Sequence, residues 1–62
     1  MKSFIFNNWH AWESNGKILL SDEDVKKLFR FNSVDDCIKW LYMNGDKDAA
    51  RMLNANKGAS HV

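Results

Sequence analysis

A chain of 62 residues has room for only one small hydrophobic core, and this limit constrains what it can fold into. A domain of this size hides only about 60% of the surface that its unfolded chain exposes. Chains this short therefore often add disulfides, a metal ion or a second copy of themselves. Cys37 is the only cysteine, which excludes a disulfide within the chain. His10 and His61 are the only other soft ligands and show no ligand spacing, so we expect no metal site. Self-association remains open.

The amino-terminal residues have too short an apolar stretch for a secretory signal peptide. No segment approaches the roughly 18 consecutive apolar residues that a membrane span needs. A single thiol without such a leader is typical of a protein in a reducing cytoplasm. We therefore expect a cytoplasmic protein that has no membrane partner.

The first third of the chain has the composition of a small sheet. Residues 4–6 and 18–20 are apolar runs that contain several good strand formers. Asn15-Gly16 lies just before the second run, and Asn-Gly favours a tight hairpin turn because both residues accept positive φ. We expect the two apolar runs to pair with a sheet partner, most simply with each other.

Residues 9–14 allow two interpretations. A two-residue turn at Asn15-Gly16 would extend this segment as a strand and place Trp12 opposite Leu19. The alternative is a short helix over 9–14 that ends at Gly16. The sequence leaves both interpretations open.

The remaining residues have the periodicity of three short helices. Ser21 and the acids after it are typical of a helix start, and the apolar spacing then predicts a helix over residues 22–30. Ser33 precedes a second apolar helix, over 34–44, which Asn44-Gly45 ends. A third helix is expected over 46–55.

Together these elements predict an α+β domain in which a short amino-terminal β-hairpin or small sheet packs on three short helices. An all-α fold is the alternative if residues 9–14 are helical and the apolar runs do not pair. Residues 1–57 are expected to form a single globular domain, and residues 58–62 a frayed tail.

The residues that could carry chemistry do not form a catalytic pattern. Cys37 lies on the predicted core face of its helix, and His10 has no partner at a meaningful spacing. The carboxylates cluster in the first turns of the predicted helices, where they act as caps and dipole partners. We therefore expect no enzymatic activity and no cofactor.

Aromatic residues are the most informative feature, because three tryptophans, one tyrosine and four phenylalanines exceed what one tiny core readily hides. Helix 34–44 is apolar well beyond one stripe, and a helix of that kind is either central or covered by a partner. The tryptophans could simply make the core. The other interpretation is an exposed patch for self-association or for a partner protein. The candidate interaction residues are Trp9, Trp12, Trp40 and Met43.

A small DNA-binding regulator is the alternative function. Its binding surface would be the basic face of the last helix, formed by Lys47, Arg51, Asn54 and Lys57. The net charge is only +1 and no basic stripe stands out, whereas DNA binders need several uncompensated cations. We therefore favour a protein partner over nucleic acid.

The segment Phe31–Asn54 resembles the small early-region accessory proteins of temperate lambdoid phages. The resemblance covers less than half of the chain and includes no catalytic motif, so no functional residue is carried over. It implies a non-enzymatic accessory or regulatory protein in the bacterial host cytoplasm. Such a protein would bind a host protein, here through the aromatic patch, with a homodimer as one form of the association.

Overall fold

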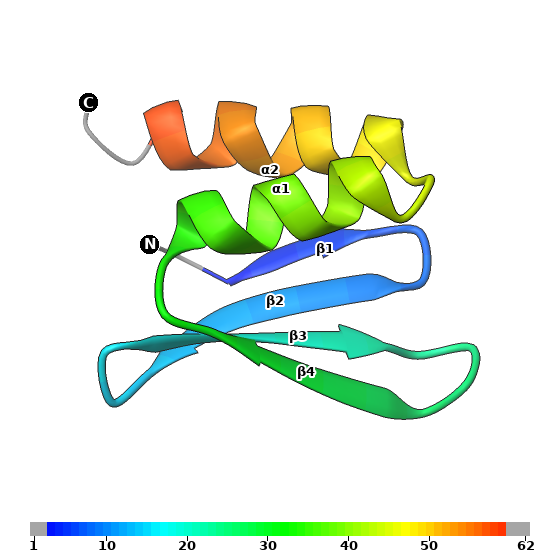
Figure 1. Cartoon of the computed structure of the whole chain (residues 1–62), viewed down its shortest axis with the longest axis horizontal. Helices are drawn as coiled ribbons and strands as arrows, with labels where there is room; N and C mark the ends of the chain where they lie inside the picture. Colours follow the sequence, from blue (N-terminus) through cyan, green and yellow to red (C-terminus); the bar gives the residue numbers. More distant parts are fainter. Residues whose placement is uncertain (1–2, 60–62) are drawn as a thin grey trace.

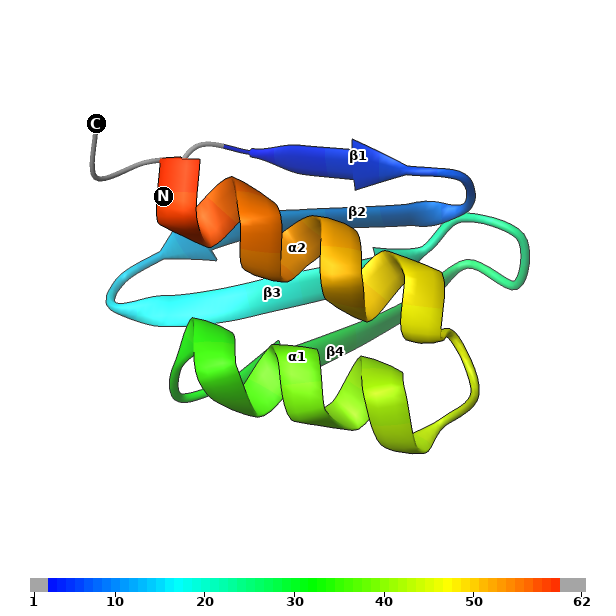
Figure 2. The same cartoon turned by 90° about the horizontal axis from the view of Figure 1, so that it is seen from above.

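The computed structural model describes residues 3–59 and shows a two-layer α+β domain. One layer is an antiparallel sheet in the order β1-β2-β3-β4. The strands are β1 (Phe4–Phe6), β2 (Trp9–Ser14), β3 (Lys17–Asp22) and β4 (Lys27–Phe31). The helices α1 (Val34–Met43) and α2 (Lys47–Ala59) form the other layer, on one face of the sheet (Figures 1 and 2). The predicted fold class is confirmed, and the all-α alternative is wrong.

The hairpin between β2 and β3 forms as the Asn-Gly signal predicted. Asn15 and Gly16 have φ values of 51° and 76°, the positive angles that a type I′ turn requires. Trp12 pairs with Leu19, which is the predicted register. Residues 9–14 are therefore a strand, and the helical interpretation of this segment is wrong.

The predicted pairing of residues 4–6 with residues 18–20 is wrong. β1 pairs with β2, so that Phe6 lies opposite Trp9 across a two-residue turn. Asn7 in this turn has a φ of 53°, a conformation that asparagine tolerates better than most residues. The shorter connection wins because consecutive strands usually pair when a tight turn can join them.

The predicted helix over residues 22–30 is also wrong, so the sheet packs on two helices and not three. This segment contains the end of β3, a turn, and most of β4. The spacing of the apolar residues in this segment is typical of a helix. However, Val25 and Leu28 are 65% and 60% exposed and do not form a buried helix face. Phe29 lies opposite Leu20, so this aromatic side chain packs on the core from a strand. The pairing of β4 with β3 therefore overrides the local helical pattern.

The signals at the start and the end of α1 are confirmed. Ser33 Oγ accepts a hydrogen bond from the Asp36 backbone N–H at 3.2 Å, at the start of α1. Gly45, with a φ of 98°, follows the end of this helix. Helix α2 runs to Ala59 and is thus longer than the predicted helix. The remainder of the predicted tail, residues 60–62, lies outside the described residues.

The core lies between the layers. The buried sheet residues are Phe4, Trp9, Ala11, Ile18 and Leu20, and the buried helix residues are Cys37, Leu41, Ala49, Ala50 and Leu53. Ala49 and Ala50 have small side chains, which lets α2 approach α1 and the sheet closely. This packing leaves the opposite face of the sheet without a covering layer among the described elements (Figure 1).

Candidate interaction surface

Two of the predicted interaction residues, Trp9 and Trp40, lie between the two layers. Trp9 is only 8% exposed, and its Nε1 donates a hydrogen bond to the Asp46 carboxylate. Trp40 is partly buried against the core. Its ring lies 5.9 Å from that of Trp9 in an edge-on arrangement and 4.5 Å from that of Phe29. Both side chains therefore hold the sheet to the helices.

The other two predicted interaction residues lie on different layers. Met43 is 82% exposed at the carboxyl end of α1. Trp12 belongs to β2, where Ala11 points into the core, so Trp12 points to the other side of the sheet. The structure therefore does not bring the four predicted residues together on one surface.

The sheet face that carries Trp12 is the candidate interaction surface, and we call it the outer face. Strand alternation and register place nine side chains on it. They are Ile5, His10, Trp12, Ser14, Lys17, Leu19, Ser21, Leu28 and Arg30. Both helices lie on the opposite side of the sheet, and no element that the structure describes covers the outer face (Figures 1 and 2).

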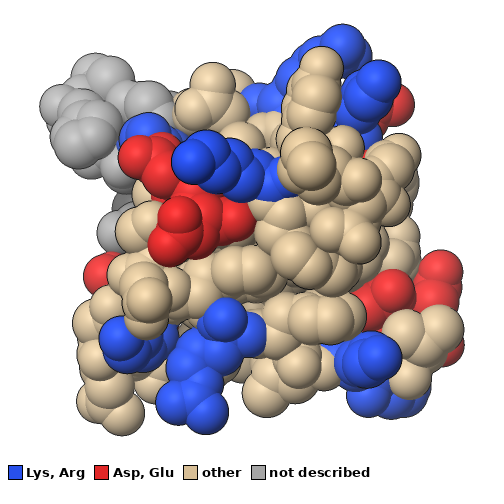
Figure 3. Space-filling model, in the orientation of Figure 1, with Lys and Arg blue, Asp and Glu red and all other residues tan. Residues whose placement is uncertain are grey.

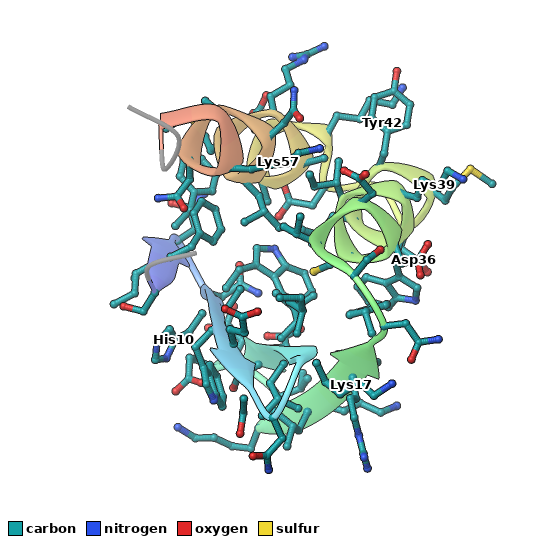
Figure 4. The ribbon with its side chains drawn as sticks, turned by 90° about the vertical axis from the view of Figure 1, so that its left-hand side faces the viewer. His10, Lys17, Asp36, Lys39, Tyr42 and Lys57 are labelled. Carbon is teal, nitrogen blue, oxygen red and sulfur yellow. The ribbon has the colours of Figure 1, made fainter. Side chains whose placement is uncertain are left out.

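The outer face has an apolar centre. Trp12 pairs with Leu19 across β2 and β3, and the rings of Trp12 and His10 lie 4.7 Å apart. Ile5 and Leu28 occupy the two edge strands and are 73% and 60% exposed. His10 extends from the side of the sheet away from the helices (Figure 4). An antiparallel sheet with one solvated face normally carries polar residues there, so this apolar centre is unusual.

A shallow hollow of about 350 Å3 lies at one end of the outer face. Leu19 and Leu28 contribute its apolar lining, and Lys17 and Arg30 contribute positive charge. Lys17 Nζ donates a hydrogen bond to Asn32 Oδ1 at 2.8 Å, which fixes the position of the ammonium group. This end of the outer face is therefore basic.

Charge differs between the two ends of the outer face. None of the nine side chains is acidic, but Ser21 Oγ donates a hydrogen bond to the Glu23 carboxylate. That bond holds a negative group beside the outer face at the turn between β3 and β4. Figure 3 shows lysine and arginine side chains along the sheet side of the molecule, with acidic side chains beside some of them at one end. Strand β3 thus begins at Lys17, and the turn that follows it carries Glu23 together with Lys26.

The candidate DNA-binding residues lie on α2, where charged and aromatic neighbours contact the basic side chains. Arg51 pairs with Asp48 at 3.4 Å, and Lys57 pairs with Asp35 of α1. Lys47 Nζ lies 5.4 Å from the centre of the Tyr42 ring. Asn54 is exposed. Figure 4 shows Lys57 beside the helix pair and Tyr42 extending from α1 away from the sheet.

The two side chains that could carry chemistry, Cys37 and His10, lie on opposite sides of the sheet. Cys37 is buried in the core, and burial raises the pKa of its thiol to about 12, so it stays protonated at neutral pH. His10 lies on the outer face, across the sheet from this thiol. Within residues 3–59, no three His, Cys, Asp or Glu side chains are grouped to hold a metal ion. None of the helices in this range has the length and apolar character of a transmembrane passage.

Sequence reasoning missed most of the outer face. It identified Trp12 but not Ile5, Leu19, Leu28 or Arg30. Residues 9–14 and 17–22 do not alternate strictly between apolar and polar, so this surface is defined only once β4 lies beside β3. No family model, curated protein or solved structure matches this chain, so the surface must be interpreted from its own geometry.

Proposed function

We propose that this chain is a non-enzymatic protein-interaction module that binds a partner protein through the outer face of its sheet. One observation carries the proposal: Ile5, Trp12, Leu19 and Leu28 form an apolar surface that no described element covers. Apolar side chains gathered on one uncovered face of a small domain are typical of protein-interaction sites.

The composition of the outer face supports a protein as the partner. Interface centres are enriched in tryptophan, and a central tryptophan is a frequent energetic anchor. Trp12 lies in an interior strand, with Leu19 beside it and the edge residues Ile5 and Leu28 around it. Aliphatic edge residues suit a protein surface better than the stacked bases of a nucleic acid, which favour aromatic platforms.

The resemblance of Phe31–Asn54 to phage accessory proteins implies that the partner is a bacterial host protein and that the role is regulatory. None of the nine side chains of the outer face belongs to this segment. The proposal that the outer face is the binding surface therefore does not depend on the resemblance.

Affinity capture from a bacterial lysate with matched variants tests the proposal. Trp12→Thr and Leu28→Thr keep strand propensity and remove apolar surface from the outer face. Met43→Ser removes a similarly exposed side chain from the helix layer. We expect the outer-face variants to lose the captured partner, with affinity reduced about tenfold or more, and Met43→Ser to retain it. Retention by both outer-face variants, or loss only with Met43→Ser, would contradict the proposal.

DNA binding through α2 has weaker support, because Arg51 and Lys57 already pair with carboxylates. Binding to phosphates would have to replace these ion pairs. A salt titration with duplex DNA separates the two functions, since binding to phosphates weakens steeply as salt is added. We expect no measurable binding at about 50 mM salt. Salt-sensitive binding that Arg51→Ala abolishes would favour the regulator instead.

A further inference from the structure

We infer that the open edge of β4 accepts an extended segment of the partner protein as a fifth strand, with an acidic side chain opposite Arg30. This inference rests on the proposed function, because Leu28 and Arg30 belong to the outer face and the segment belongs to the partner that this face binds. Three observations carry it: free backbone groups on β4, a partly buried aromatic row beside them, and a guanidinium group without a carboxylate partner.

The hydrogen-bond pattern of the sheet determines which backbone groups of β4 are free. Ser14 and Lys17 close the two-residue turn as a hydrogen-bonded pair, and such pairs recur at every second residue of an antiparallel ladder. The hydrogen bond of 2.8 Å from the Glu23 N–H to the Asn8 C=O follows the same alternation. Leu20 lies at an intervening position of β3, so its backbone groups point toward β4.

The same alternation continues into β4, which is an edge strand. Leu20 lies opposite Phe29, so Phe29 bonds to β3, and its neighbours Leu28 and Arg30 direct their N–H and C=O groups away from β3. No element that the structure describes lies on that side of β4 (Figure 2). An extended segment could bond to all four of these groups, which is how peptides add to the edges of other sheets.

An aromatic row lies beside the free edge, on the helix side of the sheet. Phe29 and Phe31 point to this side from β4, and the centre of the Trp40 ring lies 4.5 and 6.0 Å from the centres of their rings. All three side chains are only partly buried. Figure 3 shows a largely uncharged band between the helix layer and the sheet, on the side where α1 and β4 lie. A fifth strand would place alternate side chains on this row and bury more of it.

The charge of β4 selects an acidic segment. Arg30 is exposed, and within residues 3–59 its guanidinium has no ion-pair or hydrogen-bond partner. Lys17 adds a second cation beside the same hollow. Glu23, Asp24 and Lys26 lie in the turn, at least four residues or roughly 13 Å from Arg30, which exceeds the screening length of about 8 to 10 Å at physiological salt. A carboxylate on the residue directly opposite Arg30 therefore compensates this charge best.

The helix side of the edge selects no charge. Lys27 lies at the start of β4, and its Nζ lies 5.8 Å from the centre of the Phe29 ring. Asp36 lies in the first turn of α1, which follows the other end of β4. Charges of opposite sign thus flank the aromatic row, so the segment needs apolar or neutral side chains on this side.

A second copy of the chain fits the edge less well. Only one antiparallel register uses all the free groups of both copies, and it places Arg30 opposite Leu28 of the other copy, so both guanidinium groups stay uncompensated. A shift by two residues places Arg30 opposite either Arg30 or Lys26, and like charges directly opposite each other are destabilising. Charged side chains on edge strands discourage the pairing of identical edges in this way.

Nuclear magnetic resonance of the isotope-labelled chain with synthetic peptides tests the inference. The probe is Thr-Val-Glu-Val-Val-Thr-Thr with blocked ends, which in antiparallel register places its glutamate opposite Arg30 and its fifth residue opposite Leu28. One control peptide has lysine in place of the glutamate. The other has proline as its fifth residue, which removes the N–H that would bond to the Leu28 C=O.

In the free chain, we expect the amide protons of Leu28 and Arg30 to exchange about tenfold or more faster than those of Phe29 and Phe31, which bond to β3. The probe should slow exchange at Leu28 and Arg30. Its dissociation constant should be about 0.1 to 1 mM, because a short free segment loses conformational freedom on binding. The lysine peptide should bind about fivefold more weakly, and the proline peptide should give no protection.

Two variants of the chain separate the charge contact from general electrostatic attraction. Arg30→Glu should reverse the preference, so that the lysine peptide binds more tightly than the probe. Lys39→Glu makes the same charge change on the helix layer and should leave the preference unchanged (Figure 4). Circular dichroism establishes that each variant is folded.

The inference is overturned if about 2 mM probe leaves exchange at Leu28 and Arg30 unchanged, or if the glutamate, lysine and proline peptides bind equally. Slower exchange at these two amides as the free chain is concentrated would identify a second copy as the occupant instead. If the probe does not bind but Trp12→Thr still abolishes lysate capture, the inference fails and the proposed function stands. If the probe binds as expected but Trp12→Thr and Leu28→Thr retain the captured partner, the proposed function fails and the strand-binding edge stands.

Discussion

At the scale of single residues, Asp46 joins the two layers of the domain. One carboxylate oxygen accepts a hydrogen bond from the Ala49 backbone N–H at 3.0 Å, which caps α2. The other oxygen accepts the hydrogen bond from the indole of Trp9, a buried residue of β2. One side chain therefore fixes both the start of the last helix and the position of a core tryptophan.

We predict that Asp46→Ala lowers the free energy of unfolding by about 2 to 3 kcal/mol. The helix loses its cap, and the buried Trp9 N–H loses its acceptor. Urea unfolding followed by tryptophan fluorescence measures the change. Asp48→Ala is the matched control, because this exposed carboxylate in the same helical turn should cost less than about 1 kcal/mol. Equal costs for the two variants would contradict the role of Asp46.

Cys37 gives the domain a dependence on alkaline pH. Burial raises the pKa of its thiol from 9.0 to about 12, so the folded state keeps the proton to higher pH than the unfolded state does. Stability from this group is complete below about pH 9 and declines as the pH rises above that value, by up to about 1.4 kcal/mol per pH unit.

The pH prediction is tested by comparison of the wild-type chain with Cys37→Ala. Between about pH 8 and about pH 10, we expect the wild-type chain to lose about 1 kcal/mol of unfolding free energy relative to the variant. The comparison cancels the titration of lysine and tyrosine side chains. A constant difference between the two proteins across this range would show that the thiol does not resist ionisation.

At the scale of elements, the turn between β3 and β4 explains the largest error of sequence reasoning. Lys26 has a φ of 56°, although it is neither glycine nor asparagine, so the turn carries no standard sequence signal. Asp22 Oδ1 accepts hydrogen bonds from Asn8 Nδ2 and from the Asp24 backbone N–H, at 2.9 and 3.1 Å. The turn is therefore stabilised by a residue from another turn, which no local pattern predicts.

We predict that Lys26→Gly raises the free energy of unfolding by up to about 1 kcal/mol, because glycine adopts positive φ without the steric cost of a side chain. The same substitution in a helix interior would lower stability by about 1 kcal/mol, so the sign distinguishes the turn from the helix. Thermal or urea unfolding measures it. Lys27→Gly, one residue later in β4, is the control and should destabilise the chain.

At the scale of the whole molecule, the three tryptophans lie on both sides of the sheet. Trp9 and Trp40 pack between the layers, and Trp12 lies on the outer face. Six of the eight aromatic side chains therefore pack in or against the core, and the outer face holds one of them, Trp12.

We predict that Trp40→Ala mainly lowers the stability of the fold, whereas Trp12→Thr mainly weakens partner binding. Trp40→Ala should cost about 3 kcal/mol, which is most of the stability of a domain this small. Trp12→Thr should cost no more than about 1 kcal/mol, but should weaken partner binding. Urea unfolding and the capture experiment measure the two properties. A large loss of stability with Trp12→Thr would assign this residue to the fold instead.

Local sequence determined the elements whose signals are short-range. The turn at Asn15-Gly16, the cap at Ser33 and the extent of α1 all follow from residues within a few positions of one another. Local backbone preference and capping are strong enough to specify such features without the rest of the chain. The α+β class follows from the same signals.

Only the tertiary structure determined that residues 22–30 form a turn and a strand, and which side chains lie on the outer face. The helical spacing of Val25, Leu28 and Phe29 was overridden because pairing with β3 places Phe29 on the core. That pairing creates an edge strand and assigns Leu28 and Arg30 to the surface opposite the helices. The sequence by itself therefore determined the fold class and the extent of α1, but not which apolar side chains are exposed. Strand register, which depends on contacts between distant residues, determined where those side chains lie.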